Sequence, residues 1–215
     1  SHLDWNSATL TFSAVAGWED QPLILVSWYG ACAYANGLSR DNGLTPCYSE
    51  ADWSCDFTAD GYRLPTEAER EYAARGGAHN PYTKYPWGDS IDGSNANYFS
   101  SGDPYASNTP QTTPVGYYNG LQTPVGSDMA NGYGLYDMSG NVWEWCSDWY
   151  GRDYYKDSPV DDPQGPASGT RKVIRGGDWY SDGRDCRTAF RYAGLPHGTF
   201  YATGMRVVMT LGDAS

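Results

Sequence analysis

Apolar residues recur at helical spacing in the segment VSWYGACAYANGLS, near the start of the chain. Trp28, Cys32 and Ala35 fall on one face of a helix. Ser27 can cap the start of that helix, and Gly37 suits its end. The pattern predicts a short amphipathic helix.

A second helix is predicted in the segment LPTEAEREYAARGG. Thr66 is followed three residues later by Glu69, which is the pattern of a capping box, and Glu67 adds negative charge to the first turn. Gly76 can adopt the left-handed conformation that ends many helices. Start and end are therefore both marked in the sequence.

Three later segments have the pattern of short strands: NVWEWCSDWY, KVIRGGDW and GMRVVMTL. In the first, Val142, Glu144 and Cys146 alternate with the residues between them, which is the period of a strand. Gly176 and Gly177 interrupt the second segment, where glycines permit a bulge or a close backbone approach.

The chain between residues 77 and 129 is predicted to be a long loop, because Pro, Gly, Asn, Ser and Thr occur throughout it. Its many aromatic side chains can anchor the loop to the rest of the domain. Polar residues such as Asp92, Asn95 and Asp103 either bond their own backbone in turns or bind a hard cation such as calcium.

The chain of 215 residues is expected to form a single domain over residues 4–215, with a sizeable core. Its 19 tyrosines and 26 glycines, together with few lysines and glutamates, predict little helix and much irregular chain. No apolar run approaches the roughly 20 residues that span a bilayer. No transmembrane segment is therefore expected.

The net charge of −12 argues against nucleic acid as a partner, since binding to phosphates needs a basic face. A cationic or neutral ligand is easier to accommodate. The opening residues contain no signal peptide, so an export signal or lipid anchor is expected to lie outside this sequence.

Five cysteines are present, and none forms a C-x-x-C pair that would indicate zinc or a thioredoxin-type motif. Cys47 and Cys55 flank a short polar segment and can form a disulfide in an oxidising compartment. A reduced, buried set of thiols is equally compatible with the sequence.

The segments GYRLPTEAEREYAARGG, NGYGLYDMSGNVWEWCSDWY, VIRGGDW, CRTAFR and GMRVV follow one another along the chain. Together they resemble the successive motifs of the formylglycine-generating enzyme, or sulfatase-modifying factor, family, over residues 25 to 209. The resemblance implies the C-type-lectin-like fold in the form found in that family. That is an α+β fold with few helices, short twisted antiparallel sheets and much irregular chain.

Catalytic members of this family carry two cysteines, five positions apart, that bind copper and oxidise a substrate cysteine to formylglycine. Here Ser181 stands at the first position and only Cys186 matches the second. Serine is a poor ligand for Cu(I), so copper is not expected and the protein is predicted not to be an enzyme. Cys186 is then a small buried apolar residue. The alternative is an oxidase, or another enzyme of the family, that uses Cys186 with a different partner.

The stretch WYSDGRDCRTAFRYAGLPHGTFYATG, at residues 179–204, mixes aromatic, small and charged residues without a regular hydrophobic period. Rigid aromatic contacts and adaptable small residues are typical of an antibody paratope, so the sequence predicts a ligand-binding surface. The alternative is that the aromatic residues pack onto the sheet. The candidate ligand-binding residues are Tyr180, Ser181, Asp182, Gly183, Arg184, Asp185, Phe190, Tyr192, Ala193, Gly194, Leu195, His197, Gly198, Thr199, Phe200, Tyr201, Ala202 and Thr203.

The same stretch resembles the variable region in the variable proteins of diversity-generating retroelements, of the Treponema type. In that group, adenine-directed mutagenesis rewrites AAC codons into NNC codons, which cannot encode Lys, Glu, Gln, Met or Trp. None of those residues occurs at positions 180–204. The residues expected to be a fixed scaffold are Cys186, Arg187, Thr188, Ala189, Arg191, Pro196, Gly204 and Arg206.

This second resemblance implies a C-terminal variable region at residues 180–203. It implies a protein or other cell-surface molecule as the ligand, and export to, or display on, the bacterial cell surface. A monomer is expected. No carbohydrate-binding motif is present in the sequence, so a sugar ligand does not follow from the lectin-like fold.

The family resemblance also implies structural calcium, although no cofactor is required for the predicted function. Its metal-binding segments correspond to Asn97 and Tyr98 in NANYF, and to Asn141 and Glu144 in GNVWEW. Asp103 is the expected acidic partner of Asn97. The alternative is that Asn141 bonds backbone groups in a tight turn, without an ion.

Overall fold

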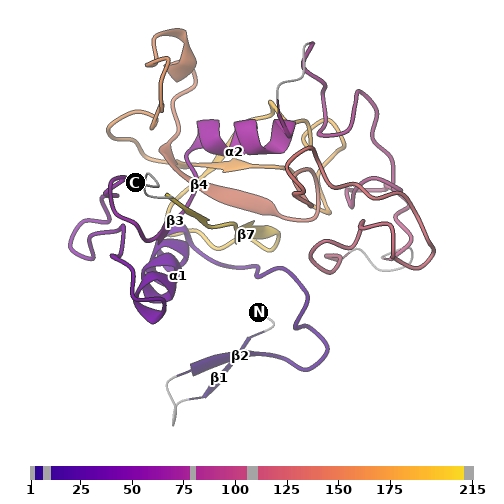
Figure 1. Cartoon of the computed structure of the whole chain (residues 1–215), viewed down its shortest axis with the longest axis horizontal. Helices are drawn as coiled ribbons and strands as arrows, with labels where there is room; N and C mark the ends of the chain where they lie inside the picture. The colour runs from indigo at the N-terminus through magenta and orange to yellow at the C-terminus, as the bar shows by residue number, and fades with distance from the viewer. Residues whose placement is uncertain (1–2, 7–10, 78–80, 106–110, 211–215) are drawn as a thin grey trace, which may run out of the picture.

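Two helices and several short strands are joined by long irregular segments in the computed structural model, which describes residues 3–6, 11–77, 81–105 and 111–210 (Figure 1). The elements are β1 (Leu3–Asn6), β2 (Thr11–Ala14), α1 (Trp28–Asp41), β3 (Tyr62–Arg63), α2 (Glu67–Arg75), β4 (Trp143–Trp149), the 3-10 helix η1 (Tyr154–Lys156), β5 (Lys172–Arg175), β6 (Tyr192–Gly194), β7 (Thr203–Met205) and β8 (Val208–Met209). The predicted α+β architecture with few helices and much irregular chain is confirmed.

The central sheet has the strand order β6-β5-β4-β7. Strand β5 pairs antiparallel with both β4 and β6, whereas β4 and β7 run parallel. The sheet is therefore mixed, which differs from the antiparallel arrangement that the family resemblance implies. A parallel pair needs a long crossover, and here the chain supplies one by passing through β5 and β6 between β4 and β7.

Helix α1 begins where the sequence predicts, because the Ser27 side chain accepts a hydrogen bond from the backbone of the first turn. It continues past Gly37, contrary to the prediction. The Asn36 side chain donates to the Tyr48 carbonyl oxygen (2.8 Å) and accepts from the Tyr48 N–H (3.0 Å). These tertiary bonds hold the second half of the helix, and the left-handed turn comes only at Gly43 (φ 70°).

Helix α2 confirms the local prediction at both ends. The Thr66 hydroxyl accepts from the Glu69 N–H (3.1 Å), and the Glu69 carboxylate accepts from the Thr66 N–H (2.7 Å). Gly76 ends the helix in the left-handed conformation (φ 64°). The capping box and the terminal glycine therefore define this helix.

The hydrophobic core joins α1 to one face of the central sheet. Trp28 of α1 packs in one cluster with Trp143, Trp145 and Ile174. The Trp28 indole N–H donates to the Cys146 carbonyl oxygen (2.9 Å), so the ring is also fixed in orientation. Large aromatic side chains with one polar atom each thus stabilise the core.

All five cysteines are free thiols, so the structure matches the reduced alternative and not a disulfide between Cys47 and Cys55. Burial raises the pKa of Cys55 to about 12, which disfavours its thiolate. Neither helix among the described residues is long and apolar enough to cross a membrane.

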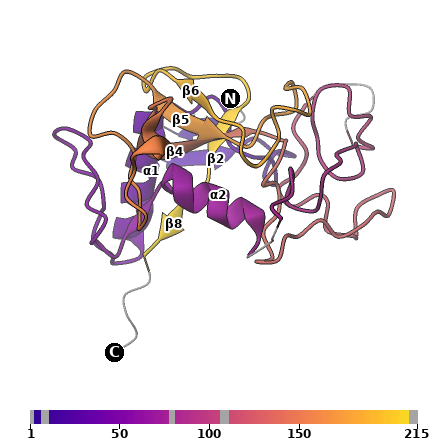
Figure 2. The ribbon, with the colours of Figure 1, turned by 90° about the horizontal axis from the view of Figure 1, so that it is seen from above.

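The long loop prediction holds for the described part of residues 77–129, where no helix or strand is found. Tyr85 and Tyr118 are buried, whereas Tyr82 and Phe99 are exposed. Only some of the aromatic side chains of the loop, such as Tyr85 and Tyr118, therefore anchor it to the rest of the domain. Figures 1 and 2 place this segment together on one side of the molecule, beyond the end of α2.

Two buried carboxylates tie α2 to the sheet and to the C-terminal segment. Glu67 accepts hydrogen bonds from Arg175 (2.7 Å) and Arg191 (2.6 and 2.7 Å). Glu144 accepts from Arg70 (2.6 Å) and Arg206 (2.9 Å). Each carboxylate therefore lies between two guanidinium groups, which pays part of the desolvation cost of burying it.

Asp148, near the end of β4, is a buried carboxyl group with unequal oxygens. Its Oδ2 accepts from the Glu67 N–H (2.7 Å), while Oδ1 has no hydrogen-bond partner among the residues that the structure describes. Burial raises the pKa of Asp148 to about 7. The folded protein therefore binds a proton here more tightly than the unfolded chain does.

The substitution Asp148→Asn is expected to reduce the pH dependence of stability. A carboxyl with a raised folded-state pKa stabilises fully at low pH and loses that contribution as pH rises, by up to about 1.4 kcal/mol per pH unit between about pH 4 and 7. Urea unfolding of both proteins across this range measures the slope. Parallel stability curves for the wild type and the variant would contradict the assignment.

Candidate ligand-binding site

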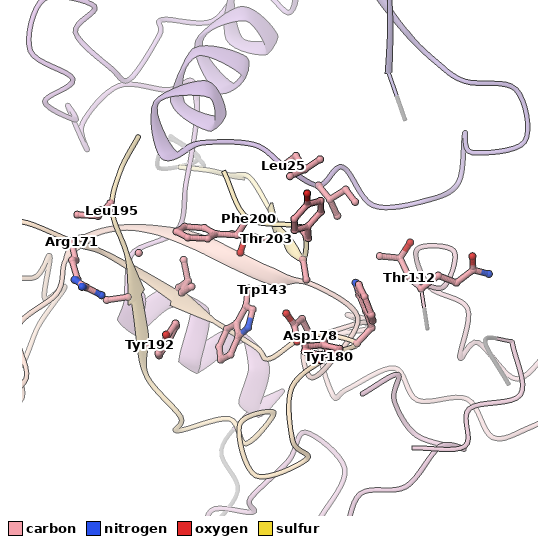
Figure 3. Close-up of a pocket in the computed structure, with 18 of the residues that line it drawn as sticks. Leu25, Thr112, Trp143, Arg171, Asp178, Tyr180, Tyr192, Leu195, Phe200 and Thr203 are labelled. Carbon is pink, nitrogen blue, oxygen red and sulfur yellow. The ribbon is translucent and has the colours of Figure 1, made fainter. Parts of the chain in front are cut away.

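A cavity of about 820 Å³ opens above the central sheet (Figure 3). Its lining comes from the segment before α1, from residues 111–112, from Trp143 of β4 and from the region between residues 171 and 203. The lining residues are Trp18, Ile24, Leu25, Gln111, Thr112, Trp143, Arg171, Ile174, Asp178, Trp179, Tyr180, Tyr192, Ala193, Gly194, Leu195, Phe200, Tyr201, Ala202 and Thr203. A concave, mostly apolar lining with a few polar groups is typical of a ligand pocket.

The strands of the central sheet form the floor of the cavity. Trp143 of β4 stacks on Tyr192 of β6, with ring centroids 5.7 Å apart. Thr203 of β7 pairs with Trp143, and Gly194 pairs with Lys172 of β5. Because side chains alternate along a strand, Trp143 faces the cavity from a position that the backbone hydrogen bonds fix.

Exposed aromatic residues surround the opening. Tyr180, Tyr192 and Tyr201 are 66%, 54% and 79% exposed, and Phe200 and Leu195 are also exposed. Figure 3 shows Tyr180 at one end of the cavity and Tyr192 nearer the other. A concave apolar site with an exposed aromatic rim is a surface on which ligands or partner proteins bind.

The structure brings half of the predicted ligand-binding residues to this cavity. They are Tyr180, Tyr192, Ala193, Gly194, Leu195, Phe200, Tyr201, Ala202 and Thr203. Ala193, Gly194, Ala202 and Thr203 are buried in or beside the strands, whereas the other five present exposed side chains. The same stretch thus supplies both the floor and the rim.

The other predicted residues lie outside the cavity. Residues 181–185 pack against the long loop, where the Phe99 N–H donates to the Ser181 carbonyl oxygen (2.9 Å) and the Tyr85 hydroxyl donates to the Gly183 carbonyl oxygen (3.0 Å). Within residues 181–185, Asp182 and Arg184 form an exposed ion pair, and Asp185 is half-buried.

Phe190 lines a separate cleft together with Arg187 and Arg191, and its ring also contacts that of Trp143 (6.0 Å). For Phe190, the alternative that the aromatic residues pack onto the sheet therefore holds in part. His197, Gly198 and Thr199 belong to the turn between β6 and β7, where the Gly198 N–H donates to the Leu195 carbonyl oxygen (2.9 Å).

Ten lining residues are absent from the sequence prediction: Trp18, Ile24, Leu25, Gln111, Thr112, Trp143, Arg171, Ile174, Asp178 and Trp179. The strand alternation around Trp143 gave one usable signal, because it placed a tryptophan on the face opposite Glu144. Trp18 and Thr112 carry no such signal, since they reach the cavity only through tertiary folding.

Asp178 is the one carboxylate that lines the cavity among the described residues. It is 8% exposed, and its Oδ1 accepts from the Ser181 hydroxyl (2.6 Å) and the Tyr180 N–H (3.0 Å). Burial raises the pKa of Asp178. The Asp178 end of the cavity therefore combines a buried acidic group with aromatic rings.

Gly194 is held where a side chain has no room. A Cβ there would lie 2.8 Å from the Trp145 ring and 2.9 Å from the Phe200 ring. Gly194→Ala is expected to cost about 1–3 kcal/mol of folding free energy, because the rings must move. Leu195→Ala, at the neighbouring exposed position, should cost within about 0.5 kcal/mol in the same denaturation experiment. Equal losses for both variants would contradict this packing.

The two positions that correspond to catalytic cysteines in the family do not form a thiol pair. Cys186 is fully buried, and burial raises the pKa of its thiol. Its sulfur lies against Gly177, where an added Cβ would be 2.5 Å away. The Ser181 hydroxyl is bonded to Asp178. The arrangement thus offers no exposed thiolate nucleophile at Cys186.

The four calcium candidates do not converge as a set of free oxygen ligands. The Glu144 carboxylate contacts Arg70 and Arg206, and the Asn141 Oδ1 accepts from the Thr113 N–H (3.0 Å). The Asn97 side-chain amide donates to the Gln111 carbonyl oxygen (2.7 Å).

Tyr98 and the backbone of Asn97, which belong to the same calcium candidates, also have hydrogen-bond partners within the protein. The Tyr98 hydroxyl donates to the Ile91 carbonyl oxygen (3.3 Å), and the Asn97 carbonyl oxygen accepts from the Asn141 N–H (2.8 Å). No cluster of three or more His, Cys, Asp or Glu side chains that could hold a metal occurs in the described part of the chain. Because the Glu144 carboxylate is bonded by two guanidinium groups, the geometry does not fit calcium at Glu144.

The fold is C-type-lectin-like, and comparison with known proteins gives the family of the chain. The sulfatase-modifying factor enzyme 1-like domain matches residues 1–211. The chain therefore belongs to the sulfatase-modifying factor family, as its sequence motifs predict.

Relatives in this family have different names. The formylglycine-generating enzyme of Streptomyces coelicolor is 35% identical over 221 residues, which cover 98% of this chain and 61% of that enzyme. The serine/threonine-protein kinase pkn1 of Chlamydia caviae is 40% identical over 192 residues, which cover 88% of this chain and 24% of the kinase. The chain thus spans less than two thirds of either relative.

Solved structures support the fold assignment. Treponema denticola variable protein 1 superposes with a TM-score of 0.67 and 31% identity, over 90% of this chain and 73% of that protein. PvdO from Pseudomonas aeruginosa superposes with a TM-score of 0.66 and 29% identity, over 89% of this chain and 63% of that protein. The same fold therefore occurs in proteins with different names.

Proposed function

We propose that this protein is a non-catalytic binding module that recognises a protein or another cell-surface molecule through the cavity and its aromatic rim. The observation that carries the proposal is the cavity of about 820 Å³, lined by aromatic residues and opening between exposed tyrosines. Large rigid rings give contact area at a low cost in conformational entropy. The similarity to Treponema denticola variable protein 1 supports a binding role.

We further propose that the rim is diversified between related genes. Most residues expected to be fixed have structural roles: Cys186, Thr188, Pro196 and Gly204 are buried, and Arg191 and Arg206 pair with buried carboxylates, whereas Arg187 and Ala189 are exposed. Tyr180, Tyr192, Leu195, Phe200 and Tyr201 are exposed and tolerate change without loss of the core. Display at, or export to, the bacterial surface as a monomer belongs to the same proposal.

The gene and its downstream flank test the diversification directly. The expected result is a codon ending in C at each candidate ligand-binding position between 180 and 203, with a near-copy carrying AAC codons beside a reverse transcriptase gene. Ordinary codon usage and no such copy would remove diversification from the proposal. The binding role would then be tested by the affinity of variants at Tyr180 and Tyr201.

An enzyme of the formylglycine-generating type is the second candidate, because relatives with that name cover nearly the whole chain. Burial of Cys186 and hydrogen bonding of Ser181 count against it. We expect no tight Cu(I) binding in a titration with a colorimetric competitor. Tight binding that Cys186→Ala abolishes would favour the enzyme instead.

A further inference from the structure

We propose that the cavity binds an organic cation, an ammonium or guanidinium group on an apolar stem, whose charge lies next to Asp178. This inference rests on the proposed binding function and adds the chemical class of the group that enters the cavity. The same chemistry occurs in lysine and arginine side chains of a partner protein and in small quaternary ammonium compounds.

The first argument is the state of the Asp178 carboxylate. Both donors that bond it, the Ser181 hydroxyl and the Tyr180 N–H, bond the same oxygen, Oδ1. No Lys or Arg side chain of the described residues forms a salt bridge with Asp178. A carboxylate that is more than nine-tenths buried and has no cationic partner is costly, and a cation that enters the cavity offsets this cost.

The second argument is the aromatic wall beside this carboxylate. Trp179 and Tyr180 meet edge to face with centroids 5.6 Å apart, and the Trp143 ring lines the same cavity as Asp178. The face of a tryptophan or tyrosine ring attracts a cation, most strongly where water is excluded. Apolar walls around a single negative charge therefore favour a cation that carries apolar groups over a hydrated metal ion.

The protein already uses this chemistry elsewhere. The Nζ of Lys172 lies 3.9 Å from the ring centroid of Trp28 and 3.9 Å from that of Trp149. That ammonium group is buried between two indole rings and donates to the Ser147 carbonyl oxygen (2.8 Å). The cavity has the same kinds of group, aromatic faces and an oxygen acceptor, but its cation must come from a ligand.

The charge distribution agrees with this assignment. Arg171 is the one cationic residue that lines the cavity among those described, and Figure 3 places it at the end away from Asp178, near Leu195. The net charge of −12 attracts cations to the molecule as a whole. A cationic group is therefore drawn toward the protein and then toward the Asp178 end of the cavity.

Choline and its uncharged isostere, 3,3-dimethyl-1-butanol, test the proposal in the whole chain. Titrations followed by NMR of the indole N–H signals give both affinities, and we expect choline to bind at least tenfold more tightly. Asp178→Asn should remove that preference while leaving the affinity for the alcohol unchanged, because asparagine keeps the Oδ1 acceptor. Asp161→Asn, an exposed carboxylate outside the cavity, is the matched control and should retain the preference.

Three capped peptides, each with one lysine, trimethyllysine or arginine, identify the source of the cation. Tighter binding of a peptide than of choline indicates a partner protein, and the reverse indicates a small ligand. Equal binding of choline and the alcohol, or a preference that Asp178→Asn leaves intact, would overturn the inference. If the alcohol binds in the cavity without a preference for charge, the binding function stands and only its cationic ligand class is lost.

Discussion

Replacing Glu144 by glutamine is expected to lower the free energy of unfolding by about 3–5 kcal/mol, because it leaves the buried guanidinium group of Arg70 and the half-buried one of Arg206 without their shared carboxylate. Glu144 is 3% exposed and contacts Arg70 at 2.6 Å and Arg206 at 2.9 Å. Arg206 also donates to the Tyr136 carbonyl oxygen (3.0 Å). The contacts of Glu144 with Arg70 and Arg206 thus join α2, β4 and the C-terminal segment. Chemical denaturation of the wild type and the variant measures the loss.

Glu50→Gln is the matched control, since Glu50 pairs with Arg40 on the surface, where such pairs contribute about 0–1 kcal/mol. Both variants should be measured with a chelator and with excess calcium. The expected loss for Glu144→Gln is the same in both conditions. A loss that occurs only with calcium would show that Glu144 is a calcium ligand, and a loss below about 1 kcal/mol would contradict the buried network.

The double variant Tyr180→Ser, Tyr201→Ser is expected to lose at least about 30-fold in affinity for peptides selected against the wild-type protein. Aromatic residues at the rim of a pocket are the kind of side chain whose removal costs about 2 kcal/mol or more of binding free energy. Both side chains are more than half exposed, so the fold should be retained. Titration calorimetry with peptides from an unbiased display library measures the change.

The double variant Tyr34→Ser, Tyr72→Ser removes the same groups elsewhere on the surface. These tyrosines lie on α1 and α2 and are 52% and 65% exposed. Their removal should change peptide affinity less than twofold. Comparable losses for the two double variants, or full affinity after removal of Tyr180 and Tyr201, would show that the selected peptides bind outside the rim.

Local sequence signals predicted the second helix well, because every group that defines its ends lies within a few residues of Thr66 and Gly76. The first helix shows the limit of such signals. Gly37 is compatible with a helix end, but the bonds between Asn36 and Tyr48 stabilise a continuation that no local pattern shows. Tertiary contacts decided that boundary.

Glu144 shows the same limit for chemistry. Its residue type and motif suit a calcium ligand, yet its partners Arg70 and Arg206 lie 74 and 62 residues away in the sequence. The candidate site is likewise built from residues that lie far apart in the sequence. The stretch 180–203 was identified by composition, but Trp18 and Asp178 reach the cavity through folding, and neither could be placed there from sequence spacing.

Hydrogen–deuterium exchange with and without a library-selected peptide tests the central claim most directly. We expect slower exchange in the segments that line the cavity, at residues 18–25, 178–180, 192–195 and 200–203. Exchange elsewhere on the sheet should be unchanged. Protection confined to the outer faces of α1 or α2, with none at residues 178–203, would contradict a binding function for this cavity.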